Sequence, residues 1–174
     1  MNNKHLKYVK LRIQLFNLKN SKPVKFPSNP IFIVLFVILG LIFSIMLIGV
    51  FITSSHQGLS CLTWPLCPNG FDFPPPKYLY EHLHRSLILI LAITLFSFTF
   101  FSLKKVQNSK FLTKLIIASI ILTTQIALGW LVINSRLHPI VVATHLSTAV
   151  ALFGIILIAL ISVYNELRGE KIKI

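Results

Sequence analysis

Acidic residues are scarce in this chain. Only four of its 174 residues are Asp or Glu, against 17 Lys and Arg, and charged residues make up 12% of the total. A soluble domain usually carries about 25% charged residues, because its surface must face water. The deficit argues against a soluble domain, and the composition is instead 55% hydrophobic.

Cysteine is also scarce, with Cys61 and Cys67 as the only two. Two cysteines without evident partner ligands argue against a zinc site. Their spacing is not C-x-x-C and there is no second pair, which argues against a quinone-linked thiol–disulfide oxidoreductase of the membrane. Both lie in a loop that we expect outside the cytoplasm, where either a structural disulfide or a redox-active pair persists.

The hydrophobic residues occur in four long runs, at 31–52, 83–103, 111–133 and 140–164. A helix that crosses about 30 Å of hydrocarbon needs roughly 20 apolar residues. Only a helix satisfies its own backbone over such a run in lipid. The connections after the second and third runs are short, so the helices that they join are antiparallel. We therefore predict an all-α integral membrane protein, an antiparallel bundle of four transmembrane helices.

The basic residues that give the chain its net charge of +13 gather in the segments that we expect on one side of the membrane. Basic residues concentrate in residues 1–30, around 104–114 and after residue 164, and basic residues mark the cytoplasmic side. This distribution predicts that both termini lie on the cytoplasmic side and that the loops 53–80 and 134–139 lie on the outer side. Membrane topology therefore explains the excess of basic residues, and no nucleic-acid partner is needed to account for it. The expected organisation is a basic N-terminal segment (1–30), a four-helix domain (31–164) and a basic tail (165–174).

The N-terminal segment is not expected to be a removable signal peptide, because the first apolar run is too long and lacks a small-residue cleavage site. Apolar side chains recur at helical spacing among the lysines of residues 5–18. This pattern fits either a short helix on the anionic inner leaflet or a solvated basic tail.

Ionisable groups in membrane helices are rare and usually functional. Glu81 and His84 are three residues apart near the start of the second run and share a helix face. His145 stands near the start of the fourth run, which crosses the membrane in the same direction, so it lies at a depth similar to that of His84. Two inward-facing histidines at one level of a bundle predict axial ligation of a haem iron from both faces.

Two further residues belong to this predicted site. Arg85 follows His84 and can pair with a haem propionate. Gly129, in the third run, lets a helix or a flat ligand approach closely. The simpler interpretation of His84 and His145 is a pair of polar helix ends, but their matched depth and the nearby Glu81 favour a ligand site. There is no strong internal sequence repeat.

Several motifs resemble the haem A synthase family, in the family's order. Residues 58–67, GLSCLTWPLC, resemble its first outer-loop motif, and residues 81–85, EHLHR, resemble its Glu-x-x-His-Arg motif at the start of the second helix. Residues 125–129, QIALG, and 143–146, ATHL, resemble its third and fourth helices. The resemblance extends over about residues 31–164.

The resemblance implies an activity. Family members oxidise the C8 methyl group of haem O to a formyl group with oxygen from water, which gives haem A for terminal oxidases. By this likeness His84 and His145 hold the substrate haem, and Glu81 is the acid–base or charge-stabilising group. Gln125 and Gly129 belong to the haem-binding part, and the cysteine pair matches one that is either structural or catalytic. Haem B is a possible further cofactor.

The chain departs from the family in two ways. Typical members have eight helices, and their second half binds a haem B that accepts electrons, whereas this chain resembles the catalytic N-terminal half. Either this chain pairs with a second copy or another four-helix subunit, or one bundle does everything. Of these we favour a homo-oligomer, and we expect haem O synthase as a further partner. Position 63 is often Asp in the family and is Thr63 here.

Two functions follow from these patterns. The first is the enzyme, in the cell membrane with its site toward the outer side. The second is a non-catalytic bis-histidine b-type cytochrome that only carries electrons. Glu81 distinguishes the two, because an electron carrier has no need of an acid beside its haem ligand.

Overall fold

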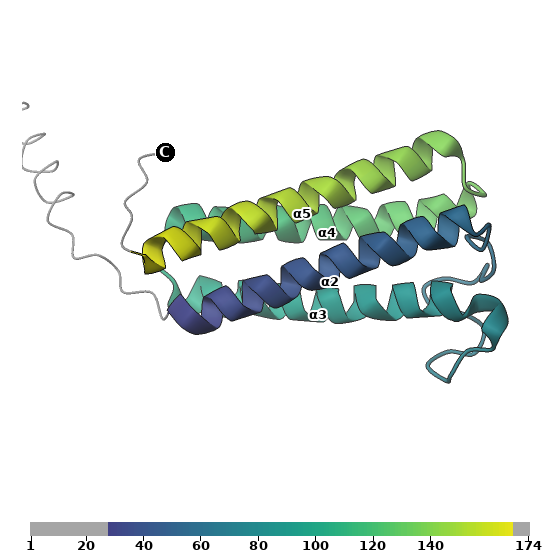
Figure 1. Ribbon diagram of the computed structural model, residues 1–174, viewed down its shortest axis with the longest axis horizontal. Coiled ribbons are helices and arrows are strands. Elements are labelled where there is room, and N and C mark those ends of the chain that lie inside the picture. The colour runs from purple at the N-terminus through teal and green to yellow at the C-terminus, as the bar shows by residue number, and fades with distance from the viewer. Residues whose placement is uncertain (1–27, 169–174) are drawn as a thin grey trace, which may run out of the picture.

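The computed structural model describes residues 28–168, and it consists of four long helices and a short 3-10 turn (Figure 1). The helices are α2 (Ser28–Ser54), α3 (Leu79–Lys105), α4 (Ser109–Asn134) and α5 (Pro139–Leu167), and the turn is Pro76–Tyr78. The predicted surface helix at 5–18 and the end of the basic tail lie outside the described residues.

All four helices are long and apolar enough to cross a membrane. They contain 26 to 29 residues each, which at about 1.5 Å per residue exceeds the hydrocarbon thickness. Large apolar side chains cover their outward faces, as a surface in lipid requires; Phe36 and Ile93, for example, are 62% and 60% exposed. The predicted all-α membrane fold of four helices is therefore confirmed.

Local sequence explains where the helices begin. The Asn108 side chain accepts a hydrogen bond from the backbone N–H of Phe111 and caps α4. Pro139 is the first residue of α5, where a missing N–H costs nothing. α3 begins at Leu79, four residues before the apolar run, so Glu81 lies in its first turn.

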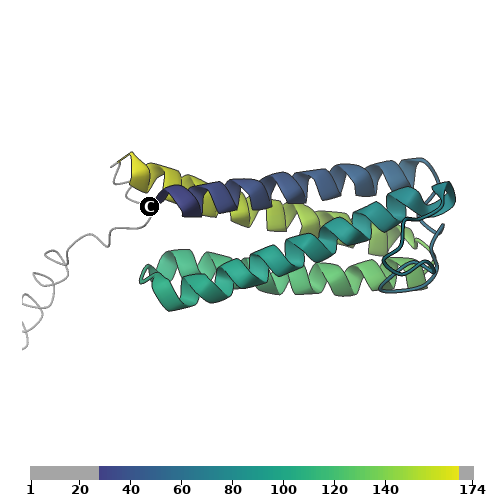
Figure 2. The same cartoon turned by 90° about the horizontal axis from the view of Figure 1, so that it is seen from below.

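Each helix of the bundle contacts two neighbours. α2 lies against α3 and α5, and α4 lies against the same two helices, so α3 and α5 are diagonal within the described part of the chain. The long connection from α2 to α3 covers the end of the bundle at which α4 turns into α5 (Figures 1 and 2). We call this end the loop end. Both α3 and α5 start there.

Large apolar side chains fill the interior away from the loop end. Buried positions recur at alternating spacings of four and three residues along α2 and α4, the pattern of helices that cross at about 20°. On α2 they are Ile31, Leu35, Ile38, Ile42 and Ile45, with Ile52 seven residues farther on, and on α4 they are Phe111, Leu115, Ala118, Leu122 and Gln125. Residues 31–50 and 111–130 have the same burial class at every position. The bundle thus contains an internal repeat, with α2 and α4 in equivalent places, that residue identities do not reveal.

Candidate functional site

The apolar core stops before the loop end, and the two predicted histidines follow it there. His84 lies seven residues before Leu91 on α3, and His145 lies seven residues before Leu152 on α5; both leucines are 2% exposed. Seven residues are two helical turns, so each histidine continues the buried face of its helix. Because α3 and α5 are diagonal, the imidazoles enter the interior from opposite sides.

Neither imidazole has its hydrogen-bonding capacity satisfied. The Nδ1 atoms of His84 and His145 are buried and have no hydrogen-bond partner within the described residues. Buried polar side-chain atoms are usually bonded, and the exceptions require an explanation. The two unbonded Nδ1 atoms are such exceptions, and a ligand site at the histidines would account for them.

A glycine lies beside each histidine on the neighbouring helix. A Cβ atom placed on Gly49 of α2 would lie 3.1 Å from Cε1 of His84, and one on Gly129 of α4 would lie 3.7 Å from Cε1 of His145. Gly49 and Gly129 are equivalent positions of the internal repeat. Each half of the bundle therefore has the same arrangement, a glycine on one helix that gives space to a histidine on the next.

Gln125 of α4 forms hydrogen bonds to α5 at His145. Its side chain is 7% exposed, and its Nε2 donates to the carbonyl oxygen of His145 at 2.8 Å and to Oγ1 of Thr148 at 2.7 Å. The amide thus joins α4 to α5 one turn before Gly129. Its contact is with the backbone of His145 and not with the imidazole.

These residues fit a haem with two axial histidines. Among the described residues no group of three or more His, Cys, Asp or Glu side chains could hold a metal ion. A porphyrin supplies four of the six donors to its iron, so two opposed imidazoles complete the set. Because Gly49 and Gly129 have no side chains, the neighbouring helix places no Cβ atom against either imidazole.

Glu81 lies in the same turn of α3 as His84 but contacts the loop. It is 5% exposed, and its Oε2 accepts hydrogen bonds from Oγ of Ser60 at 2.8 Å and from the backbone N–H of Cys61 at 2.9 Å. Its Oε1 forms an ion pair with Arg85 at 2.6 Å. Both carboxylate oxygens are therefore engaged by protein groups.

The guanidinium of Arg85 is engaged in the same way. Besides Glu81, it donates to the carbonyl oxygens of Cys61, Thr63 and Pro65. The ion pair and these bonds hold the loop against the first turns of α3. The sequence did not predict that Arg85 holds the loop. The spacing of Glu81 and Arg85 indicates that they share a helix face, but it does not indicate which loop carbonyls Arg85 would bond.

The two cysteines lie in this same loop. The sulfur atoms of Cys61 and Cys67 are 2.20 Å apart and their Cα atoms are 5.4 Å apart, and the side chains are nearly inaccessible, at 0% and 3% exposure. Cys61 is also the residue whose backbone N–H and carbonyl bond to Glu81 and Arg85. The cysteine pair and the charged pair therefore constrain one segment.

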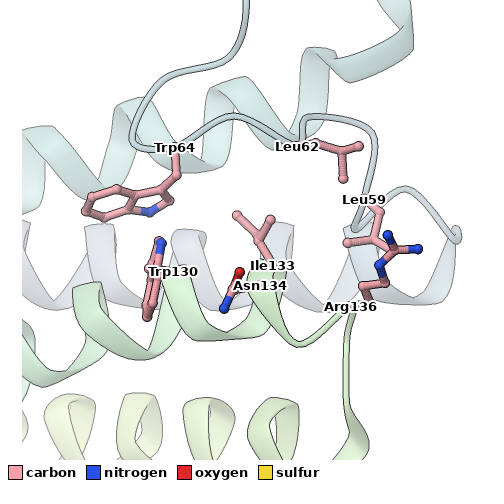
Figure 3. A pocket seen from close by; sticks show the side chains of 7 residues that line it. All are labelled: Leu59, Leu62, Trp64, Trp130, Ile133, Asn134 and Arg136. Atoms are coloured by element: carbon pink, nitrogen blue, oxygen red, sulfur yellow. The ribbon is translucent and has the colours of Figure 1, made fainter.

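A cavity of about 390 Å³ lies between this loop and the end of α4 (Figure 3). Its lining residues are Leu59, Leu62, Trp64, Trp130, Ile133, Asn134 and Arg136. The volume is in the range of small-molecule sites. Sequence reasoning assigned none of these residues to the site, because the loop residues and the α4 residues are more than sixty positions apart.

Residues 70–172 match the family model COX15-CtaA, described as cytochrome oxidase assembly protein. This match covers more than half of the chain. It contains Glu81, His84 and His145 and begins after the cysteine pair.

Two curated proteins are similar to parts of the chain. A protein of Lysinibacillus sphaericus named "Heme A synthase" is 28% identical over 129 residues, which are 72% of this chain and 42% of that protein. A protein of Haloarcula marismortui named "Protoheme IX farnesyltransferase" is 24% identical over 119 residues, 68% of this chain and 26% of that protein. The matched part of the chain thus covers less than half the length of either relative.

Proposed function

Because this chain belongs to the COX15-CtaA family of cytochrome oxidase assembly proteins, we propose that it is a haem A synthase-like oxidoreductase of the membrane. Its substrate is haem O, whose C8 methyl group is oxidised to a formyl group. With water as oxygen source, the methyl group and one water molecule give the formyl group, four electrons and four protons, of which two protons come from the methyl group and two from the water. The electrons pass to an acceptor of the membrane or to a second subunit.

The observation that carries the proposal is the pair of histidines. His84 and His145 enter the bundle from diagonal helices, each beside a glycine, with buried Nδ1 atoms that no described protein group bonds. We assign them as axial ligands of the substrate haem. They would hold the ring at its iron, which would leave the edges of the ring to be oriented by other residues of the site.

Glu81 is the proposed catalytic carboxylate, as the group that stabilises positive charge or accepts a proton near the methyl carbon. In support, it is the sole acidic side chain of the described helices at the loop end. Ser60, Cys61 and Arg85 hold it in one orientation. An oriented carboxylate stabilises developing charge without having to reorganise.

The test is haem conversion by purified protein. Wild type supplied with haem O should yield haem A, and His84→Ala and His145→Ala should each lose the two-histidine spectrum and the conversion. Ser147→Ala is a control, because Ser147 is an exposed residue of α5 that bonds only its own helix. Conversion that survives in both histidine variants would refute the assignment.

A second candidate function is supported by the contacts of Glu81. Both of its oxygens are used to hold the loop, which is also compatible with a bis-histidine cytochrome that only transfers electrons. Extraction and chromatography of the bound haems separates the two functions. Haem O and haem A together support the synthase, whereas haem B alone supports the carrier, and a preparation that binds no haem contradicts both.

We further propose that a second four-helix unit, a copy of this chain or another subunit, completes the assembly. The support is the length of the haem A synthase relative, of which this chain matches 42%. Native mass measurement in detergent should show an oligomer, and fully active monomers would exclude it. Haem O synthase is the proposed source of substrate, since one relative is named for transfer of a farnesyl group to protohaem.

The loop end is proposed to face the outer side of the cell membrane. The support is that Lys104, Lys105 and Lys110 surround the α3–α4 connection at the opposite end. A single cysteine placed at Lys77 in a cysteine-free background should react with a membrane-impermeant maleimide in intact cells. One placed at Gln107 should react only after lysis, and the reverse pattern would invert the topology.

A further inference from the structure

The cavity beneath the loop has a polar end and an aromatic end. Figure 3 shows Trp64 and Trp130 together at one end, and Leu59 and Arg136 at the other, next to the α4–α5 turn. Trp64 and Trp130 are the only tryptophans of the protein. Their indoles are 44% and 47% exposed, so a flat apolar ligand has ring surface available to it.

The aromatic end of the cavity is close to the level of the histidines. Trp130 directly follows Gly129, the residue that gives space to His145. Asn134 lies four residues farther along α4, about 6 Å toward the loop end. The cavity therefore extends outward from the height at which His145 enters the bundle.

The polar end carries a cation that no protein group neutralises. Within the described residues, the guanidinium of Arg136 makes no hydrogen bond or ion pair. Arg85, by contrast, is bonded to Glu81 and to three loop carbonyls. A ligand carboxylate would have to displace those bonds to reach Arg85, but it could reach Arg136 without breaking any.

The position of Arg136 is held by its surroundings. Arg136 and Leu137 both have positive φ, at 53° and 63°, in the turn between α4 and α5. The side chain of Leu137 lies against Gly58, where an added Cβ would come within 3.1 Å of it. The loop and the turn are thus packed together on the side where the cavity ends at Arg136.

We propose that this cavity receives the carboxylate-bearing edge of the haem, with Arg136 as the partner of a propionate. The inference rests on the proposed function and deepens it, because it assigns to Arg136 the role that the sequence suggested for Arg85. The two tryptophans flank the ring edge, and Asn134 provides an amide beside the cation. The opposite edge of the ring then points away from the α4–α5 turn.

The experiment is a titration of apo-protein with haem and with its dimethyl ester, followed by the Soret band. Replacing Arg136 by Gln should weaken the binding of haem about five- to tenfold and that of the ester less than twofold, since the ester has no charge to lose. Arg136→Lys should retain part of the difference. Lys77→Gln, which removes another exposed cation near the loop end, should change neither affinity.

Several results would overturn the inference. An equal loss for haem and ester in Arg136→Gln would mean that the residue only shapes the turn. No loss for either, with less anionic lipid retained by the protein, would assign Arg136 to a lipid phosphate. Failure of wild type to bind either porphyrin would instead refute the proposed function.

Wild type alone supplies a further test that needs no variant. An ion pair near the surface is screened by salt. The preference for haem over the ester should therefore shrink between about 0.05 M and 1 M salt. If salt does not change the preference for haem over the ester, there is no charge pair in this cavity. This conclusion does not depend on whether the variants fold.

Discussion

The imidazole of His84 lies so close to Gly49 that a Cβ atom at that glycine would be 3.1 Å from Cε1. The equivalent distance between Gly129 and His145 is 3.7 Å, an ordinary van der Waals contact. The internal repeat therefore has one tight half and one relaxed half. The two glycines form a matched pair in which the same substitution has different steric consequences.

Gly49→Ala should displace His84, whereas Gly129→Ala should leave His145 in place. Both substitutions favour the helix by about 1 kcal/mol, since alanine is the better helix former. We therefore expect apo-protein of the Gly129 variant to melt at the same or a higher temperature and to keep its haem spectrum. In the Gly49 variant His84 must move by a few tenths of an ångström, which should alter the low-spin two-histidine signal in optical and electron paramagnetic resonance spectra. Identical spectra for the two variants would contradict the steric argument.

The sequence predicts the helices well because membrane insertion imposes a simple rule. Runs of about 20 apolar residues must be helical in lipid, and all four predicted helices are present. The ends are less predictable. α3 starts at Leu79 because the turn at Pro76–Tyr78 leads into it and polar groups of the loop bond its first turns, and neither effect has a hydropathy signal.

The candidate site is predictable only in part. Matched depth predicts that His84 and His145 form one site, and in the structure each lies on the continuation of its helix's buried face toward the loop end. Gly49 could not be found in this way, because a glycine in a membrane helix has no distinctive neighbours in sequence. The contacts of Arg85 with loop carbonyls and the place of Arg136 at the cavity depend on how the loop folds over the bundle. Such contacts join residues twenty or more positions apart, and periodicity carries no information about them.

Gln125→Leu should loosen α5 at His145 with little change in volume. The substitution removes two hydrogen bonds that join α4 to α5, and bonds of this type contribute about 0.6 kcal/mol each in membrane proteins. We expect a loss of about 1 kcal/mol in unfolding free energy and a broadened haem signal. Thr124→Val, on the lipid-facing neighbour whose hydroxyl bonds only its own helix, should change neither. Equal behaviour of the two variants would argue against a role of Gln125 at His145.

The cysteine pair should be closed and structural. A bridge between Cys61 and Cys67 closes a short loop, for which chain entropy gives a stabilisation of about 2 kcal/mol. Alkylation followed by mass measurement should modify neither cysteine unless a reductant and a denaturant are both present. The double variant Cys61→Ser/Cys67→Ser should melt at a lower temperature yet keep haem conversion at permissive temperature. Complete loss of conversion with haem still bound would indicate a catalytic pair.

Glu81 and Arg85 allow the catalytic and the structural role of the carboxylate to be separated. Breaking a buried ion pair costs about 3 kcal/mol, because one charge is left without its partner, and Glu81 and Arg85 are only 6% and 11% exposed at the side chain. Arg85→Gln and Glu81→Gln should therefore both destabilise the loop, measured by hydrogen exchange of residues 59–67. If Glu81 is catalytic, Glu81→Gln should abolish haem A formation while haem stays bound, and Arg85→Gln should retain a measurable rate. Equal loss of conversion, in proportion to loop opening, would show that Glu81 acts only by holding the loop.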